Sequence, residues 1–288
     1  MLQELMNFCD ERFIPSTRKC PNCQNDCQGG CEQCLDAIHF SKIDREYNCS
    51  NIAHYYTCKY CYKYSSEIDI LISKLQSLKS YPTFDVLSIG CGPCTELVGL
   101  HRCMRRAGYS KPLTYMAFEM NEIWKPIHAF FKTVLPDRAD FNLKYSYTDA
   151  FKSIPRLDLA RIDWRPNILI LQYVISDMDK AGMPINEFID NVLINIVPHM
   201  PLNSYIILND INHWKARRWF EYLKKQFCST YNYWLYRGHF SNNNRAAYEY
   251  GTQHPTNRLS CQVDPDIDRK YNPWKFCSSA HLVLKKRS

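Results

Sequence analysis

Residues 85–97, DVLSIGCGPCTEL, predict the fold of the longer part of the chain. Apolar residues lead up to Ile89 as in a buried strand, and a GCGPC turn at residues 90–94 separates that strand from a predicted helix. Gly90 permits a sharp turn, while Gly92 lets a ligand approach the backbone where a helix N-terminus offers free N–H groups. Because plain strand-to-helix turns also contain such glycines, the turn predicts a nucleotide site only together with other signals.

Strand-like and helix-like segments alternate from residue 66 to the end of the chain. This alternation predicts an α/β fold with a doubly wound, seven-stranded and mostly parallel sheet. The last two strands have no helical pattern between them, which indicates an antiparallel pair at the edge of the sheet. The expected strands are 84–90, 112–120, 142–150, one that begins at 167, 204–211, 232–240 and 280–286, and the expected helices are 66–80, 94–108, 122–135, 183–200 and 213–227.

Two carboxylates stand where the second and third predicted strands end. Glu119 can accept hydrogen bonds from both hydroxyls of a ribose, and Asp149 can accept one from an adenine amino group. Either residue alone could equally be a surface or helix-capping acid. Because doubly wound sheets bind ligands at the carboxyl ends of their strands, the turn and the two acids together predict a nucleoside site. Thr95 occupies the position of the third glycine of the dinucleotide fingerprint, which argues against NAD.

On these residues, the region from about 66 to 288 resembles the class I S-adenosylmethionine-dependent methyltransferases, which have a Rossmann-like fold. VLSIGCGPCTEL, MAFEM and YTDAF resemble the first three motifs of that superfamily, and NILILQYVISDM resembles its fourth strand and the loop that follows. Cys94 departs from the pattern, because a third glycine is common there. The resemblance implies S-adenosylmethionine as the cofactor, bound by Ser88, Gly90, Cys91, Gly92, Glu119, Met120, Asp149, Ala150 and Gln172.

The loop after the fourth strand contains none of the familiar signatures of a methyl acceptor. It has neither an Asn-Pro-Pro-aromatic motif nor a Pro-Cys nucleophile. Tyr173 is a candidate for stacking on an acceptor base, and Asp177 is a candidate general base, although a packed aromatic and a helix cap are the plainer interpretations. Residues 238–275 form a long connection before the last strand, and we interpret it either as the acceptor-recognition segment or as a disordered insertion.

Nine of the fifteen cysteines fall within residues 1–61, so we predict a separate cysteine-rich module over residues 1–65 and a cofactor domain over 66–288. Three Cys-x-x-Cys pairs favour a tetrahedral metal site, because this spacing places two thiolates on one tight turn. We expect one or two zinc ions, with an iron–sulfur cluster as the alternative. In contrast, we interpret Cys91 and Cys94 as small residues lining the cofactor loop. The predicted metal ligands are Cys20, Cys23, Cys27, Cys31, Cys34, Cys49, Cys58 and Cys61.

The net charge of +7 and the basic and aromatic residues interleaved around these cysteines favour a nucleic-acid partner. We therefore expect a methyltransferase acting on nucleic acid, RNA rather than DNA, with the zinc module gripping the substrate. One alternative is a non-catalytic S-adenosylmethionine-binding assembly or regulatory factor, because LQYVISDM and CQVDPDIDRKYNPWKFC resemble small-ribosomal-subunit methyltransferase-like assembly factors. Another is a protein or small-molecule methyltransferase, with a cysteine-rich module that is structural or binds a protein. The sequence shows no signal-peptide pattern and no membrane-length apolar run, so we expect a cytoplasmic, intracellular protein without membrane contact.

Overall fold

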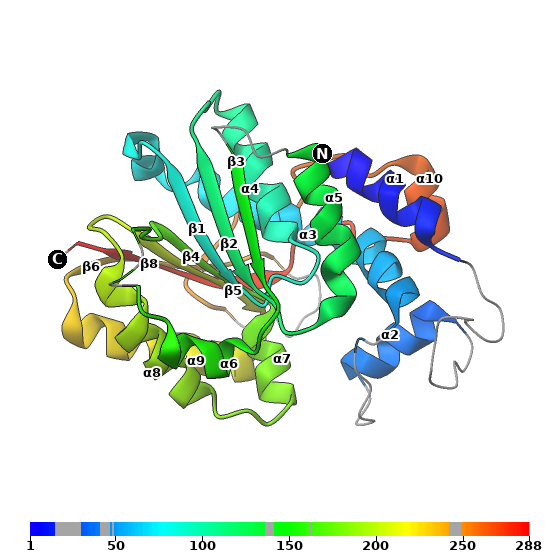
Figure 1. Ribbon diagram of the computed structural model, residues 1–288. Helices are drawn as coiled ribbons and strands as arrows, with labels where there is room; N and C mark the ends of the chain where they lie inside the picture. Colours follow the sequence, from blue (N-terminus) through cyan, green and yellow to red (C-terminus); the bar gives the residue numbers. More distant parts are fainter. Residues whose placement is uncertain are drawn as a thin grey trace.

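A mixed sheet with helices on both faces forms the centre of the protein (Figure 1). The computed structural model describes residues 1–14, 30–40, 47, 49–135, 141–159, 161, 163–241 and 249–287. Within these residues the strands are β1 (Phe84–Ile89), β2 (Leu113–Phe118), β3 (Phe141–Ser146), β4 (Ile168–Gln172), β5 (Tyr205–Ile211), β6 (Tyr233–His239), β7 (Thr252–Gln253) and β8 (Ser279–Lys286). Their order across the sheet is β3-β2-β1-β4-β5-β8-β6-β7.

The strand directions confirm the predicted doubly wound sheet. β1 pairs in parallel with β2 and β4, and parallel pairing continues to β3 on one side and β5 on the other. β8 lies antiparallel between β5 and β6, which confirms the expected antiparallel pair. The order and directions match a Rossmann-like methyltransferase fold, and the two-residue β7 is an addition to the seven predicted strands.

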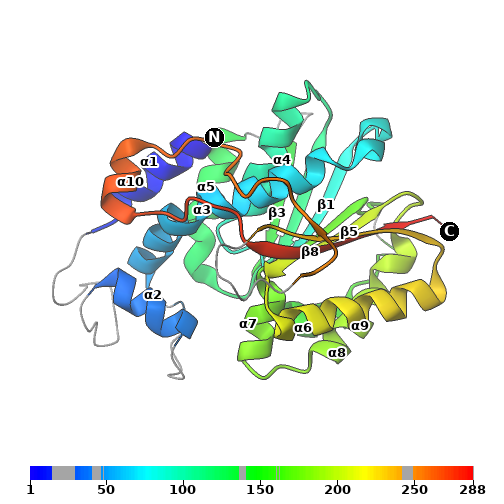
Figure 2. The same ribbon diagram turned by 180° about the vertical axis from the view of Figure 1, so that it is seen from behind.

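Helices cover both faces of the sheet, and α3, α4 and α5 lie on the face opposite to α8 and α9 (Figures 1 and 2). Alternate residues of β1 point to opposite faces of the sheet. Val86 packs into the core shared with α3, α4 and α5, and Leu87 packs into the core shared with α8 and α9. No helix in the described ranges is long and apolar enough to cross a bilayer. The helices are α1 (Leu2–Arg12), α2 (Cys31–Phe40), α3 (Ser50–Ser73), α4 (Thr95–Arg106), α5 (Lys125–Val134), α6 (Ala150–Ser153), α7 (Val174–Lys180), α8 (Ile185–Asn195), α9 (Trp214–Thr230) and α10 (Pro265–Tyr271), with 3-10 turns at η1 (Gln76–Ser80), η2 (Glu122–Trp124), η3 (Ile154–Arg156) and η4 (Val197–His199).

The helix α3 joins the cysteine-rich region to the sheet. It runs unbroken for 24 residues and is buried along most of its length. It lies so close to α4 that a Cβ on Gly99 would approach the carbonyl oxygen of Ser65 to 2.4 Å. Asp69 of α3 also accepts two hydrogen bonds from the Arg106 guanidinium, at 2.7 and 2.8 Å. The boundary predicted near residue 65 therefore falls inside a helix that packs on the same core as β1 and β2.

Candidate functional site

The turn after β1 has the backbone that the sequence predicts for a ligand cradle. Gly90 has a φ of +67°, and a Cβ there would lie 2.7 Å from Cγ2 of Val174, so glycine is required at this position. Gly92 has a φ of +48°, and the nearest atom to a Cβ there would be 4.0 Å away, in Trp124. A Cβ at Gly92 would therefore make only an ordinary contact, with Trp124, so the space beside this residue is not tightly filled.

Glu119, directly after β2, is joined to this turn. One carboxylate oxygen accepts the backbone N–H of Gly92 and the other accepts that of Asn121, both at 2.8 Å. Burial raises the pKa of Glu119 above its ordinary value. Each oxygen keeps a lone pair for a further hydrogen bond, such as one from a ribose hydroxyl. The neighbouring Met120 side chain is 69% exposed, so an apolar surface for an adenine ring lies beside the carboxylate.

Asp149 and Ala150 lie at the start of the short helix α6. The Asp149 side chain accepts the backbone N–H of Phe151 at 3.0 Å, which makes it the N-cap of that helix. Its second oxygen lies 3.5 Å from the ammonium group of Lys152. Asp149 therefore caps α6, as one of the two interpretations expected. Binding of adenine by Asp149 stays a prediction.

The side chain of Ser88 is buried and makes its hydrogen bond inside the protein. Its hydroxyl donates to the Glu96 carboxylate at 2.5 Å, and the Tyr115 hydroxyl donates to the same oxygen at 2.6 Å. Glu96 is 2% exposed, and its burial, followed by the neighbouring Cys94, raises its pKa to about 8. The sequence analysis assigned no role to Glu96. Its position in the first turn of α4, directly after the glycine turn, is the feature that could have indicated one. The hydrogen bonds of Glu96 with Ser88 and Tyr115 stabilise the glycine turn from the protein interior.

Gln172 and Tyr173, at the end of β4, connect the turn to α3. The Gln172 amide accepts from the Thr95 hydroxyl and donates to the carbonyl oxygen of Tyr64, both at 2.9 Å. Tyr173 has a φ of +55° and stacks on the Tyr64 ring with 4.0 Å between the ring centroids. Its hydroxyl donates to the buried carboxylate of Glu67 at 2.9 Å. Tyr173 is therefore held both by stacking and by a hydrogen bond.

A cavity of about 560 Å³ opens beside Tyr173. Its aromatic walls come from three tyrosines spaced one turn apart on α3, together with Tyr173 and Trp274. Lys63 is 5% exposed, and its ammonium group lies 4.6 Å from the centre of the Trp274 ring and 5.3 Å from that of Tyr173. Burial lowers the pKa of Lys63. The residues on which the cavity's chemistry depends are Tyr56, Tyr60, Tyr64, Tyr173, Asp177 and Trp274.

Asp177 of α7 lies in the wall of this cavity. Its side chain is in contact with solvent, yet the surrounding protein and then the carboxyl of Asp210 raise its pKa to about 7. Asp210 is not among the residues that line the cavity, and its two oxygens accept the backbone N–H groups of Ser176 and Ile211 at 2.9 and 2.7 Å. Asp177 makes no such hydrogen bond among the described residues. It is therefore the carboxylate available to a ligand in the cavity.

The described members of the predicted metal ligands lie in α2, in α3 and just before α3, and Cys20, Cys23 and Cys27 lie outside the described residues. Cys31 and Cys34 lie in the first turn of α2, and Cys49 immediately precedes α3. The tight turn assumed for Cys58 and Cys61 is wrong, because α3 runs through both residues and buries them completely. In the part of the chain that the structure describes, no third Cys, His, Asp or Glu side chain joins this pair at metal-ligand distance. The eight-cysteine zinc assignment stays a prediction.

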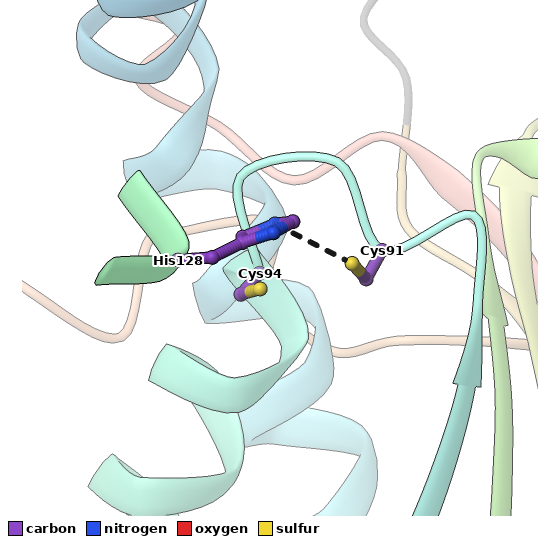
Figure 3. A group of neighbouring side chains, drawn as sticks. All are labelled: Cys91, Cys94 and His128. Carbon is purple, nitrogen blue, oxygen red and sulfur yellow. Dashed lines mark hydrogen bonds between the residues drawn. The ribbon is translucent and has the colours of Figure 1, made fainter. Parts of the chain in front are cut away.

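Cys91 and Cys94 are both buried, as expected for residues inside a tight turn. The structure adds a partner that the sequence did not indicate, the imidazole of His128 on α5 (Figure 3). Burial raises the pKa of Cys91 well above its ordinary value. Burial acts the same way on Cys94, but interactions with Cys91 and His128 outweigh it and lower its pKa.

Comparisons with known proteins give remote similarities. No protein-family model matches the chain, and no curated protein does. Among solved structures, the plantazolicin methyltransferase BpumL in complex with SAH is similar over 100% of both chains, with a TM-score of 0.47 and 11% identity. A putative rRNA-methylase from Clostridium thermocellum has a TM-score of 0.43 and 11% identity over 76% of this chain and 96% of its own. A putative O-methyltransferase from Klebsiella pneumoniae has a TM-score of 0.44 and 8% identity over 99% and 97%. These values identify no family, so a function has to be inferred from the site itself.

Proposed function

We propose that the protein is an S-adenosylmethionine-dependent methyltransferase whose acceptor is a nucleic-acid base, in RNA rather than in DNA. The proposal rests on one observation: two sites lie next to each other. The glycine turn and Glu119 form a nucleoside cradle at the strand ends, and the aromatic cavity begins at Tyr173. The two are adjacent, since Gly90 of the turn packs against Val174, the residue after Tyr173.

The residues at the cradle suit the proposed cofactor. Glu119 has two lone pairs for ribose hydroxyls, Met120 offers an exposed apolar face, and Gly92 has no side chain to block a ligand. When bound, S-adenosylmethionine would supply a methyl group that its sulfonium already activates. The work of the protein is then to align the acceptor and exclude water. Asp177 receives the proton that the acceptor atom loses when it gains the methyl group.

The cavity beside the cradle suits a planar acceptor. Tyr60 and Tyr64 stack with an interplanar angle of 7°, and such tyrosine and tryptophan faces bind any base through its π face. Near the cavity, Trp214 is 50% exposed, and Lys215 lines the cavity wall, a combination that suits a base and a phosphate. Since the tyrosines belong to α3, the cysteine-rich region contributes to this surface. A grip on RNA by its zinc module is part of the same proposal.

The acceptor class is tested by following a labelled methyl group. With S-adenosylmethionine carrying a tritiated methyl, we expect label in an RNA fraction and not in DNA or protein fractions. Trp274→Ala should raise the KM for RNA by about 10- to 100-fold, because a stacked base contributes about 1–3 kcal/mol. The affinity for S-adenosylhomocysteine should stay unchanged, and Tyr233→Ala on the distant β6 is the matched control. If label appeared in the protein fraction alone, RNA would be excluded as the acceptor, whereas methyltransferase activity itself would be supported.

The pH dependence of transfer tests the general base. The pKa of Asp177 is raised from its ordinary value to about 7, so the carboxylate form needed to accept a proton dominates only above that pH. The rate of transfer should rise about tenfold per pH unit below 7 and level off above it. In Asp177→Asn the rate should fall by about 100-fold or more, and this step in the profile should disappear. A wild-type rate that is flat between pH 5 and 8 would exclude Asp177 as the base.

A further inference from the structure

Two cysteines and a histidine meet beneath the turn that joins β1 to α4 (Figure 3). Cys91 and Cys94 come from the turn and His128 from α5, and none is more than 4% exposed. Their ligand atoms all lie within 4.8 Å of one another. We propose that these three side chains bind a zinc ion, separate from any metal held by the N-terminal cysteines.

The observed spacing suits a tetrahedral ion. Bond lengths of about 2.3 Å to sulfur and 2.0–2.1 Å to nitrogen place a sulfur and a nitrogen ligand about 3.6 Å apart. The distance between Sγ of Cys91 and Nε2 of His128 is 3.6 Å. Thiolate and imidazole are also the ligand types that zinc prefers over magnesium or calcium. An ion could therefore enter with little movement of these side chains.

The imidazole is already oriented as in a metal site. Nδ1 of His128 is hydrogen-bonded to the Tyr147 hydroxyl at 2.8 Å, and the ring stacks on Tyr145 with centroids 4.3 Å apart. Ligating histidines usually hold their second nitrogen in this manner. Without metal, Nε2 donates to the carbonyl oxygen of Gly92 at 2.7 Å. On binding, the imidazole keeps one proton by moving it from Nε2 to Nδ1, and each thiol that still carries its proton releases it to solvent.

The Tyr145 hydroxyl belongs to the surroundings of the same cluster. It is buried and interacts with the Cys94 thiol, and no other hydrogen-bond partner for it is present among the described residues. Three protein ligands leave a fourth position open on a tetrahedral zinc. A water molecule bound there could complete the coordination and hydrogen-bond to the Tyr145 hydroxyl.

The backbone of Cys94 supports the same inference. Its φ of +57° is left-handed, a conformation that costs a residue with a side chain about 1–2 kcal/mol and that glycine adopts freely. The cost is offset if the thiol binds a metal, which glycine could not do. An ion at this place would link the turn to α5 and fix the backbone of Gly92 relative to Glu119.

The test compares metal content between variants of the full-length protein purified under reducing conditions. Cys91→Ser and His128→Gln should each contain one zinc equivalent fewer than the wild type by mass spectrometry of the elements. Cys228→Ser, a partly exposed cysteine on α9, is the matched control and should keep the wild-type count. Replacement of zinc by Co²⁺ should give a tetrahedral spectrum whose sulfur-to-cobalt absorption decreases in Cys91→Ser.

A second measurement needs no variant and covers the case in which a variant fails to fold. A crystal of the wild-type protein should show an anomalous peak at the zinc edge between Cys91, Cys94 and His128. Three outcomes would each overturn the proposal: no peak at this position, unchanged zinc counts in folded variants, or a disulfide between Cys91 and Cys94 in the protein as purified. The last would indicate a redox pair instead, since Cys-x-x-Cys at a helix N-terminus also suits thiol–disulfide exchange.

Discussion

Glu67→Ala is expected to lower the free energy of unfolding by about 3–5 kcal/mol, comparable to breaking a buried charged network. Glu67 is fully buried on α3, and its carboxylate accepts hydrogen bonds from the Tyr173 hydroxyl, the Asn209 amide and two backbone N–H groups, all between 2.9 and 3.2 Å. Alanine would leave these donors without a partner, and each costs about 1–3 kcal/mol when buried. The melting temperature should fall by about 10 °C.

Two comparisons make this result specific. Glu67→Gln keeps an acceptor oxygen and the side-chain volume, so its loss of stability should be smaller than that of the alanine variant. Glu187→Ala, at an exposed position in the first turn of α8, should change the free energy of unfolding by less than about 0.5 kcal/mol. If urea unfolding gives less than 1 kcal/mol for Glu67→Ala, the network is not the main connection between α3 and the sheet.

The sheet could be predicted because its central strands are buried on both faces. A parallel strand in this position is a short continuous apolar run, such as Ile168–Leu171, and such runs are recognisable without a structure. Several of the missed elements are too short to show a period. α6 has four residues, α10 has seven and β7 has two, each too short for helical or strand periodicity to appear.

The course of α3 was not predictable for a different reason. Helices that contact α3 lie on several of its sides, namely α1, α2, α4 and α10, so it has no polar stripe to mark it as amphipathic. Its tyrosines and cysteines changed the local composition, which favoured a domain boundary at residue 65. In the structure the same tyrosines line the cavity that we propose for the acceptor.

The backbone of the glycine turn was predictable because a single segment determines it, as at Gly90 and Gly92. Partners from distant segments were not. The donors to Glu67 lie 106 to 212 residues away along the chain, and His128 lies 37 residues from Cys91 with no spacing pattern between them. Only the packing of α3 and α5 against the sheet brings these groups together.

Glu119→Ala is expected to weaken the binding of S-adenosylhomocysteine by at least about 100-fold. Hydrogen bonds to a charged group contribute about 1.5–3 kcal/mol each, and the proposed site uses two of them, one for each ribose hydroxyl. A total of about 3 kcal/mol corresponds to roughly 100-fold in affinity. The carboxylate also holds the N–H groups of Gly92 and Asn121 at 2.8 Å, so its loss frees the turn that would cradle the ligand.

Isothermal titration calorimetry measures this change directly, and two variants establish its cause. Glu119→Gln preserves one acceptor and the volume of the side chain, so its affinity should lie between those of the wild type and Glu119→Ala. Glu122→Ala removes an exposed carboxylate three residues away that pairs with Lys125 at 2.8 Å, and it should bind the nucleoside as the wild type does. Equal weakening in Glu119→Ala and Glu122→Ala would point to a general effect of negative charge. If Glu119→Ala bound S-adenosylhomocysteine as tightly as the wild type, the proposal that Glu119 binds the ribose would be wrong. A loss confined to Glu119, with Glu119→Gln intermediate, would show that the affinity depends on the buried Glu119 carboxylate and on the turn that it holds, and not on negative charge in general.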